Sequence, residues 1–169
     1  MADLLTVRDL KVSFSTDGGI ARVLDGVRLD LARGEVLGLV GESGCGKTTL
    51  ARTILGVLPA PAGRVGSGSI MFRGEDLLRK DPAALNGEVR GRAVTFIPQD
   101  PYSSFNPVFS VGTQIMELMK WKSPLLREGG RNGRRPRLLW RYPRERFQAD
   151  RQTVLDLLRA VQIPDPEDA

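Results

Sequence analysis

The chain has 169 residues, 41% hydrophobic and 27% charged, which is typical of a globular protein of one-domain length. It has a net charge of +5 and no histidine, which excludes histidine-ligated metals and serine–histidine–aspartate triads within this chain. Its single cysteine, Cys45, excludes an internal disulfide and fits a reducing compartment. Residues 1–10 lack the pattern of a signal peptide, and no apolar run reaches the length of about 18 residues expected of a membrane span. We therefore expect a cytosolic chain.

The N-terminal region alternates apolar and polar positions, which predicts an antiparallel β subdomain over residues 4–31. The expected strands are 4–16, 20–24 and 27–31. The continuous apolar run 36–40 predicts a further strand that is buried on both faces. Apolar residues at helical spacing from Leu50 to Leu58 then predict a helix that ends at Pro59.

The second half of the chain is expected to continue with short elements. We predict a surface loop over 59–68, a strand over 69–73 and a buried strand over 93–97. Between the two strands we expect a short helix over 81–89 that Asp81 caps, and after them a helix over 111–121 that Ser110 caps. A last helix, ended by Pro164, is expected to have Val154, Leu157, Leu158 and Val161 on one face. Residues 122–148 show no clean period. The end of the chain, 164–169, is expected to be solvated.

The residues Gly41-Glu42-Ser43-Gly44-Cys45-Gly46-Lys47-Thr48 match the phosphate-loop pattern G-x-x-x-x-G-K-[ST]. The glycines let the backbone approach a ligand, so that loop N–H groups and the N-terminus of the next helix converge on a phosphate. Lys47 supplies a charge for the β- and γ-phosphates, and the Thr48 hydroxyl is placed to bind Mg²⁺. The loop, together with Thr49, is therefore predicted to bind a nucleoside triphosphate, with ATP as the expected one. A glycine-rich turn with an accidental lysine is the competing interpretation.

Cys45 lies inside this loop, near a helix N-terminus and Lys47, and both features lower the pKa of a thiol. One interpretation is a reactive thiol whose alkylation blocks nucleotide binding. The other, which we favour, is a small residue that fills a serine-like position.

Residues 24–77 resemble the ATP-binding subunit of ABC transporters. Residues 97–118 resemble its oligopeptide/dipeptide importer branch, in which a Q-D-P-x-x-S-L-N-P segment occurs, with Phe105 here in place of the leucine. The ending VQIPDPEDA resembles the segment that precedes the signature loop of that branch. The resemblance covers nearly the whole chain apart from 122–148. It implies an α/β fold of the P-loop NTPase class (an ABC-type nucleotide-binding domain) with an N-terminal antiparallel β subdomain, incomplete at the C-terminus.

The resemblance also implies roles for two residues outside the loop. Phe14 matches the aromatic residue that stacks on adenine, although a core or edge-strand aromatic is an equal alternative. Gln99 matches the Q-loop glutamine, a catalytic residue that approaches Mg²⁺ and the attacking water and senses the γ-phosphate. Residues 100–107 would then form the segment that touches the membrane-spanning partner. The implied domain is partial over 1–169, with the β subdomain 4–31, a P-loop to Q-loop core over 35–107, and the start of a helical subdomain over 108–163.

Three parts of the family's site have no counterpart in this sequence: the signature loop, the Walker B acids and the switch histidine. Hydrolysis requires Mg²⁺ held by the Walker B acid and a positioned water. We therefore expect the N-terminal portion of a longer subunit, which binds ATP weakly and hydrolyses it negligibly. Because the family's core sheet takes strands from beyond residue 169, segments 36–40 and 93–97 are expected to lack neighbours.

Basic residues between Lys120 and Arg151, most of them in the basic segment 122–148, are interleaved with Trp121, Trp140 and Tyr142. We favour a solvated insertion in the helical region. Contact with anionic lipid or the transporter, and nucleic-acid binding through arginine and aromatic stacking, are the alternatives. No nucleic-acid partner is expected.

The function expected from these features is an ATP-binding subunit that powers import of peptides or related solutes. The expected partners are membrane-spanning permease subunits, a second ATP-binding subunit in a homo- or heterodimer, and, indirectly, a solute-binding protein. The expected location is peripheral, at the cytoplasmic face of the cell membrane. The alternatives are another P-loop kinase or ATPase, and a non-catalytic nucleotide- or nucleic-acid-binding protein.

Overall fold

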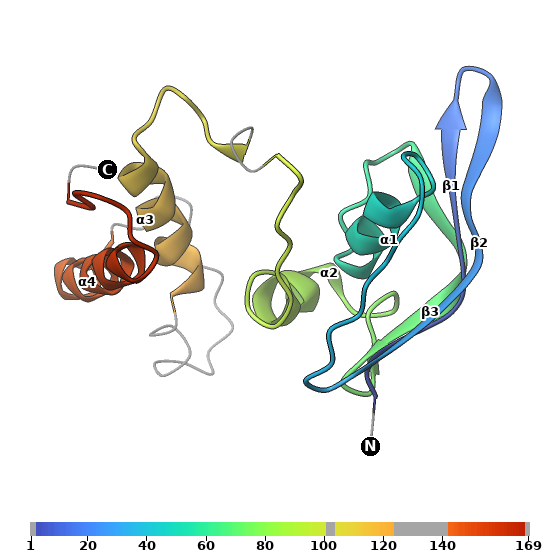
Figure 1. The fold of residues 1–169 in the computed structure, drawn as a ribbon, viewed down its shortest axis with the longest axis horizontal. Helices are drawn as coiled ribbons and strands as arrows, with labels where there is room; N and C mark the ends of the chain where they lie inside the picture. Colours follow the sequence, from blue (N-terminus) through green and yellow to red (C-terminus); the bar gives the residue numbers. More distant parts are fainter. Residues whose placement is uncertain (1–2, 101–103, 124–141, 168–169) are drawn as a thin grey trace. The chain divides into compact units, whose positions relative to one another are not determined.

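The computed structural model describes residues 3–100, 104–123 and 142–167. The chain divides into two compact units, Met1–Phe96 and Ile97–Ala169, and each is described by itself. Most of the basic segment, including Trp140, lies outside the described residues, as do residues 101–103 (Figure 1).

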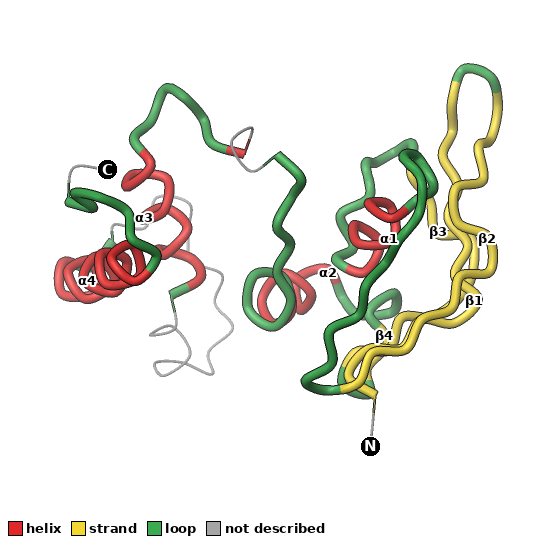
Figure 2. The backbone as a smooth tube through the Cα atoms, in the orientation of Figure 1, coloured by secondary structure: helices red, strands yellow, loops and turns green. Residues whose placement is uncertain are grey.

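A four-stranded antiparallel sheet, in the order β2-β1-β3-β4, organises the first unit (Figure 2). Its strands are β1 (Asp3–Thr16), β2 (Gly19–Ala32), β3 (Gly63–Phe72) and β4 (Glu75–Asp76). The expected antiparallel arrangement of the N-terminal region is thus present. The division of residues 20–31 into two strands was wrong. One extra residue between Leu24 and Val27 is absorbed as a bulge opposite β1, with Gly26 at a φ of 72°, and the strand continues.

The expected surface loop over 59–68 is shorter than predicted. β3 begins at Gly63, because residues 63–67 pair with β1 from Phe14 to Lys11. The start of this strand was missed because its glycines have a low propensity for strands. Pairing with β1 nevertheless holds these residues in the sheet.

Helix α1 (Lys47–Ile54) packs apolar side chains against the sheet. The buried cluster combines strand residues with residues from α1 and from the segment after β4: Val7, Leu10, Val12, Leu24, Leu50, Ile70, Phe72, Leu77 and Val89. The helix was predicted to reach Pro59 but ends at Ile54. Gly56, at a φ of 65°, turns the chain away, and the N–H groups of Gly56 and Val57 bond to the carbonyls of Thr53 and Arg52, each at 2.9 Å.

Two segments predicted to be buried strands are not strands among the described residues. Residues 36–40 have no regular structure, and Val36 and Val40 are 97% and 95% exposed. Residues 93–97 contribute only an isolated parallel bridge from Val94 to Arg90, and Ile97 is 83% exposed. A strand buried on both faces needs hydrogen-bonded neighbours. The described ranges offer none to these segments, in agreement with the expectation that they lack neighbours, so the α/β core predicted for a P-loop fold is not formed within them.

The helix predicted over 81–89 is present as a short α-helix followed by a π-helical segment. α2 (Pro82–Ala84) leads into a π-helical segment, Leu85–Val89, whose two ends are buried. Asp81 caps α2 as predicted, since its carboxylate accepts hydrogen bonds from the N–H groups of Ala83 and Ala84 at 2.9 and 3.2 Å.

The second unit contains two longer helices, α3 (Val111–Lys122) and α4 (Arg144–Ala160). Ser110 caps α3 as predicted, because its hydroxyl accepts a hydrogen bond from the N–H of Thr113 at 3.2 Å. α4 begins inside the segment for which no period was evident. The predicted apolar face of this last helix was partly wrong, since Val154 and Leu155 are buried whereas Leu157 and Val161 are exposed. The helix was also predicted to run to Pro164, but it ends at Ala160.

A buried carboxylate joins the two helices. Asp150 in α4 is 1% exposed and accepts hydrogen bonds from the hydroxyls of Ser123 and Tyr142. Arg146 lies 3.6 Å from the same carboxylate and donates a hydrogen bond to the Lys120 carbonyl at 2.9 Å. Removal of water from the Tyr142 phenol, followed by its bond to Asp150, raises the pKa of Tyr142. The cluster pins the end of α3 to the first turns of α4.

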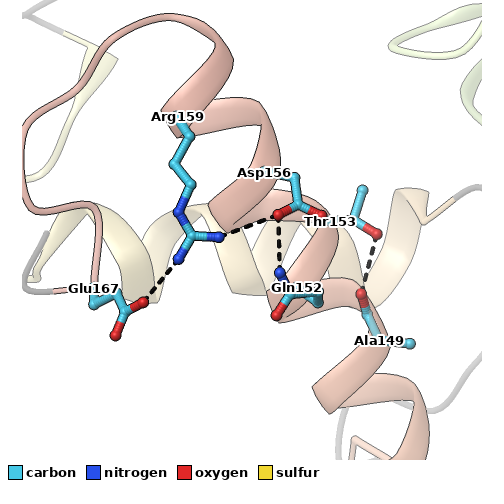
Figure 3. Close-up of polar contacts among 6 residues, drawn as sticks. All are labelled: Ala149, Gln152, Thr153, Asp156, Arg159 and Glu167. Atoms are coloured by element: carbon cyan, nitrogen blue, oxygen red, sulfur yellow. Dashed lines mark hydrogen bonds and ion pairs between the residues drawn. The ribbon is translucent and has the colours of Figure 1, made fainter.

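Polar contacts along α4 continue into the chain that follows it (Figure 3). Arg159 pairs with Asp156 at 3.2 Å and with Glu167 at 2.8 Å, and Gln152 donates to the same Asp156 carboxylate at 2.8 Å. The segment after Pro164 was predicted to be a solvated end, and residues 165 and 167 are exposed. Its Glu167 pairs with the helix at the surface. Across the ranges that the structure describes, no helix is both long and apolar enough to cross a bilayer.

The core of the first unit predicts a large difference between two isoleucines. Ile70→Ala should lower the free energy of unfolding by about 2–5 kcal/mol, because Ile70 is fully buried. Ile20→Ala should change it by less than about 0.5 kcal/mol, because Ile20 is 75% exposed. Denaturant unfolding of the two variants measures both. Equal effects would contradict the core assignment.

Candidate functional site

Residues 41–46 form a loop between segment 36–40 and α1, exposed up to Cys45 and buried at Gly46, and Lys47 and Thr48 begin the helix (Figure 1). The backbone is left-handed at Gly44 and Gly46, with φ of 83° and 96°, which favours glycine at both positions. Gly46 is the N-cap of α1, and its carbonyl accepts the N–H of Leu50 at 2.8 Å. The loop therefore enters the helix directly, as the sequence pattern predicts.

Gly46 also seats the loop against the sheet. A Cβ at this position would lie 2.9 Å from Cδ2 of Leu24 and 3.2 Å from the carbonyl oxygen of Val23, both in β2. A side chain there would press against the Leu24 side chain and the Val23 carbonyl. Two independent constraints, the left-handed φ and the closeness of β2, thus require glycine at position 46.

The N-terminus of α1 has no acceptor of its own. No side chain caps the helix, and its first turn contains no acidic residue. The helix therefore presents N–H groups and the positive end of its dipole without a competing carboxylate. This arrangement fits the oxygens of a phosphate group.

Lys47 is held inside the loop by three contacts. Its ammonium donates to the carbonyls of Gly41 and Glu42 at 2.6 and 2.7 Å, and to Sγ of Cys45 at 3.3 Å. The two short bonds fix the direction of the side chain. Thr48 follows in the first turn of α1 with an exposed side chain, and Thr49 is half-buried.

The thiol of Cys45 is exposed and faces Lys47. The hydrogen bond from Lys47 lowers the pKa of this thiol, and the charge of the ammonium adds to the effect. The direction agrees with the sequence analysis. Gly41 provides the space for the sulfur, since a Cβ there would lie 2.7 Å from Sγ.

Phe14 lies in β1 between Ala21 of β2 and Gly63 of β3. Its half-buried ring packs against the core cluster, and a Cβ at Gly63 would lie 3.0 Å from its Cε1. Core packing alone accounts for an aromatic residue here. Stacking on adenine stays a prediction.

Gln99 is exposed, has no regular secondary structure and belongs to the second unit. Its approach to the phosphate loop stays a prediction. In the same unit, Gln114 of α3 holds the backbone of residues 106–109. It accepts a hydrogen bond from the N–H of Asn106 at 2.9 Å and donates to the carbonyls of Asn106 and Phe109, each at 3.0 Å. Sequence reasoning missed this residue, because an amide on a helix face carries no spacing signal.

The Lys47–Cys45 contact predicts a pH profile for alkylation of the single cysteine. Because the thiol pKa is lowered, iodoacetamide should react with Cys45 at a lower pH than with an ordinary thiol. In Lys47→Met the profile should move to higher pH, because the ammonium donor is gone. Mass spectrometry of labelling rates measures both profiles. Superimposed profiles would show that Lys47 does not act on the thiol.

Comparison with known proteins places these residues in a family. The sequence pattern of the ABC transporter family matches residues 24–168. The chain is 36% identical, over 98% of its length, to the dipeptide transport ATP-binding protein DppD of Bacillus subtilis. It is 35% identical over 97% of its length to the oligopeptide transport ATP-binding protein OppD of the same organism, and 37% identical over 96% to DppD of Escherichia coli.

The matched regions make up 43%, 40% and 43% of these three relatives, so the chain spans less than half of their length. The match runs through the phosphate loop and Gln99, and it extends over most of the chain. The chain belongs to the ABC transporter family.

Proposed function

We propose that the chain binds ATP with Mg²⁺ at Gly41–Thr48. The observation that carries this proposal is the position of Lys47 beside an uncapped helix N-terminus without acidic residues. A triphosphate carries several negative charges, and its oxygens can accept hydrogen bonds from these donors. The three glycines of the loop have no side chains, so the backbone can come close to the phosphates.

The contacts of Lys47 indicate how the loop would receive phosphate. The ammonium has three donors, and two form short bonds to backbone carbonyls. The third contact, to Cys45 at 3.3 Å, is the longest and involves a weak acceptor. A charged phosphate oxygen is a better acceptor and would replace the sulfur, while the two carbonyls keep the side chain in place.

The exposed Thr48 hydroxyl lies in the first turn of α1, where it would hold Mg²⁺ next to the phosphates. The ion supplies charge neutralisation and orientation of the phosphates when bound. Gln99 would position Mg²⁺ and water, and Phe14 would stack on adenine. Because the sequence offers no Walker B acids and no histidine, we propose binding with negligible hydrolysis for these residues by themselves.

For the whole protein, the relatives named as dipeptide and oligopeptide transport ATP-binding proteins support a role in an importer of peptides or related solutes. We propose membrane-spanning permease subunits and a second ATP-binding subunit as partners, with a solute-binding protein acting indirectly. The location would be the cytoplasmic face of the membrane, as a peripheral subunit. ATP binding would drive closure of the two subunits, and hydrolysis in the complete site would reset them.

Replacement of Lys47 tests the proposed site. Lys47→Ala should weaken binding of a fluorescent ATP analogue with Mg²⁺ about 10–100-fold, because it removes a charged donor to the phosphates. Lys11→Ala, a lysine in β1 that is ion-paired with Asp25, should leave the affinity unchanged. Thr48→Val should reduce mainly the part of the affinity that depends on Mg²⁺.

Fluorescence titration with and without Mg²⁺ measures these effects, and circular dichroism verifies that each variant is folded. If Lys47→Ala binds the nucleotide as tightly as wild type, or if Lys11→Ala loses as much affinity as Lys47→Ala, the loop is not the nucleotide site.

A further inference from the structure

The C-terminal end of α1 is held by one side chain from a distant part of the sequence. Arg90 donates from Nε to the carbonyl of Leu55 at 2.7 Å and from Nη2 to the carbonyl of Gly56. Its Nη1 bonds to the side-chain oxygen of Asn86 at 2.7 Å. Three nitrogens of one planar guanidinium thus donate to three different acceptors, an arrangement that the ammonium group of a lysine cannot reproduce.

The two carbonyls are those that follow the last helical turn. The N–H groups of Gly56 and Val57 already satisfy Thr53 and Arg52. Leu55 and Gly56 lie beyond that motif, at the negative end of the helix dipole, where a cation is stabilising. Arg90 adds hydrogen bonds to the carbonyls of Leu55 and Gly56 at this end and places a positive charge beside it.

Gly56 is shaped to this contact. Its φ of 65° favours glycine, and a Cβ there would lie 2.8 Å from Nη2 of Arg90. Any side chain at position 56 would therefore push the guanidinium away. The contact can therefore be disturbed from both partners, although Gly56→Ala also strains a backbone that favours glycine, so the folded state of each variant has to be measured beside the effect on the loop.

α1 has only eight residues, a length of about 12 Å, and its other end is the phosphate loop. A helix this short behaves as a rigid rod, so that a tilt at its C-terminal end displaces Gly46 and Lys47 at its N-terminal end. The backbone of Arg90 is fixed as well, because its N–H bonds to the carbonyl of Leu85 at 2.9 Å and it bridges to Val94. The contact therefore joins α1 to the segment 85–94 of the same unit.

We propose that Arg90 is a positioning residue for the phosphate loop, which it aligns by clasping the far end of α1 at Leu55 and Gly56. Arg90 acts through the helix and does not touch the ligand. Its effect on nucleotide rests on the proposed function, whereas its effect on the loop itself does not.

The first test reads the loop without nucleotide, through alkylation of Cys45. The Lys47–Sγ distance is set at the N-terminal end of α1, so the pH profile of labelling reports its geometry. Arg90→Lys keeps the charge but loses the fork, and it should move the profile to higher pH, at least halfway to that of Lys47→Met. Gly56→Ala should do the same with the arginine intact. Arg79→Lys, at an 89% exposed side chain, is the matched control and should leave the profile unchanged.

Labelling is measured at a temperature where circular dichroism shows each variant to be folded. Asn86→Ala, which removes the acceptor of Nη1 and leaves the two backbone carbonyls in place, serves as a milder variant if Arg90→Lys does not fold. A profile of the Arg90→Lys, Gly56→Ala or Asn86→Ala protein that superimposes on that of wild type, despite a lower melting temperature, would reduce Arg90 to a stabilising residue and overturn the proposal.

The second test measures binding of the fluorescent ATP analogue to the same proteins. Arg90→Lys and Gly56→Ala should each weaken binding about tenfold, and the double variant should lose little more, because both changes break one contact. Fully additive losses would contradict a shared contact. If the wild-type chain binds no nucleotide, the proposed function fails, while the alkylation profiles still decide the role of Arg90.

Discussion

The close approach of Gly46 to β2 is the constraint on which the site depends. At this one residue the chain leaves the turn over 43–45, adopts a left-handed backbone and starts α1. A Cβ on Gly46 would lie 3.2 Å from the carbonyl oxygen of Val23 in β2. The core then fixes the helix behind it through Leu50, which is buried against the strands. Because the antiparallel sheet, the loop and α1 meet there, the direction of the helix N-terminus is set by packing, and no ligand is needed to create it.

The hydrogen bonds within the loop hold Lys47 in place and leave the N-terminus of α1 open to an anion. Lys47 bonds to two carbonyls of the same loop and reaches the thiol of Cys45 with its third donor, while the helix start stays uncapped. At the other end of the rod, Arg90 satisfies carbonyls that lie beyond the last turn. The N-terminal end of the eight-residue helix α1 thus has N–H donors available for a ligand, whereas carbonyls just past its C-terminal end accept hydrogen bonds from a protein side chain.

The phosphate loop could be predicted from sequence, because its glycines, lysine and threonine follow a local pattern with a local physical reason. The caps at Asp81 and Ser110 were predictable for the same reason. Segment 36–40 was not, since its apolar run specifies a strand only where hydrogen-bonded neighbours exist. The tie from Arg90 to Leu55 and the burial of Asp150 join residues 27 to 35 positions apart, and spacing along the chain holds no trace of such contacts.

The central claim is that Gly41–Thr48 recognises phosphates, with affinity drawn from Lys47 and the start of α1. Calorimetric titration of the folded chain with the Mg²⁺ complexes of ATP and ADP, and with AMP, tests it most directly. The account predicts that affinity falls steeply as phosphates are removed, with AMP the weakest ligand, because the donors of the loop address the β- and γ-phosphates. Equal affinity for AMP and ATP would contradict it, since binding would then rest on the nucleoside and not on the loop.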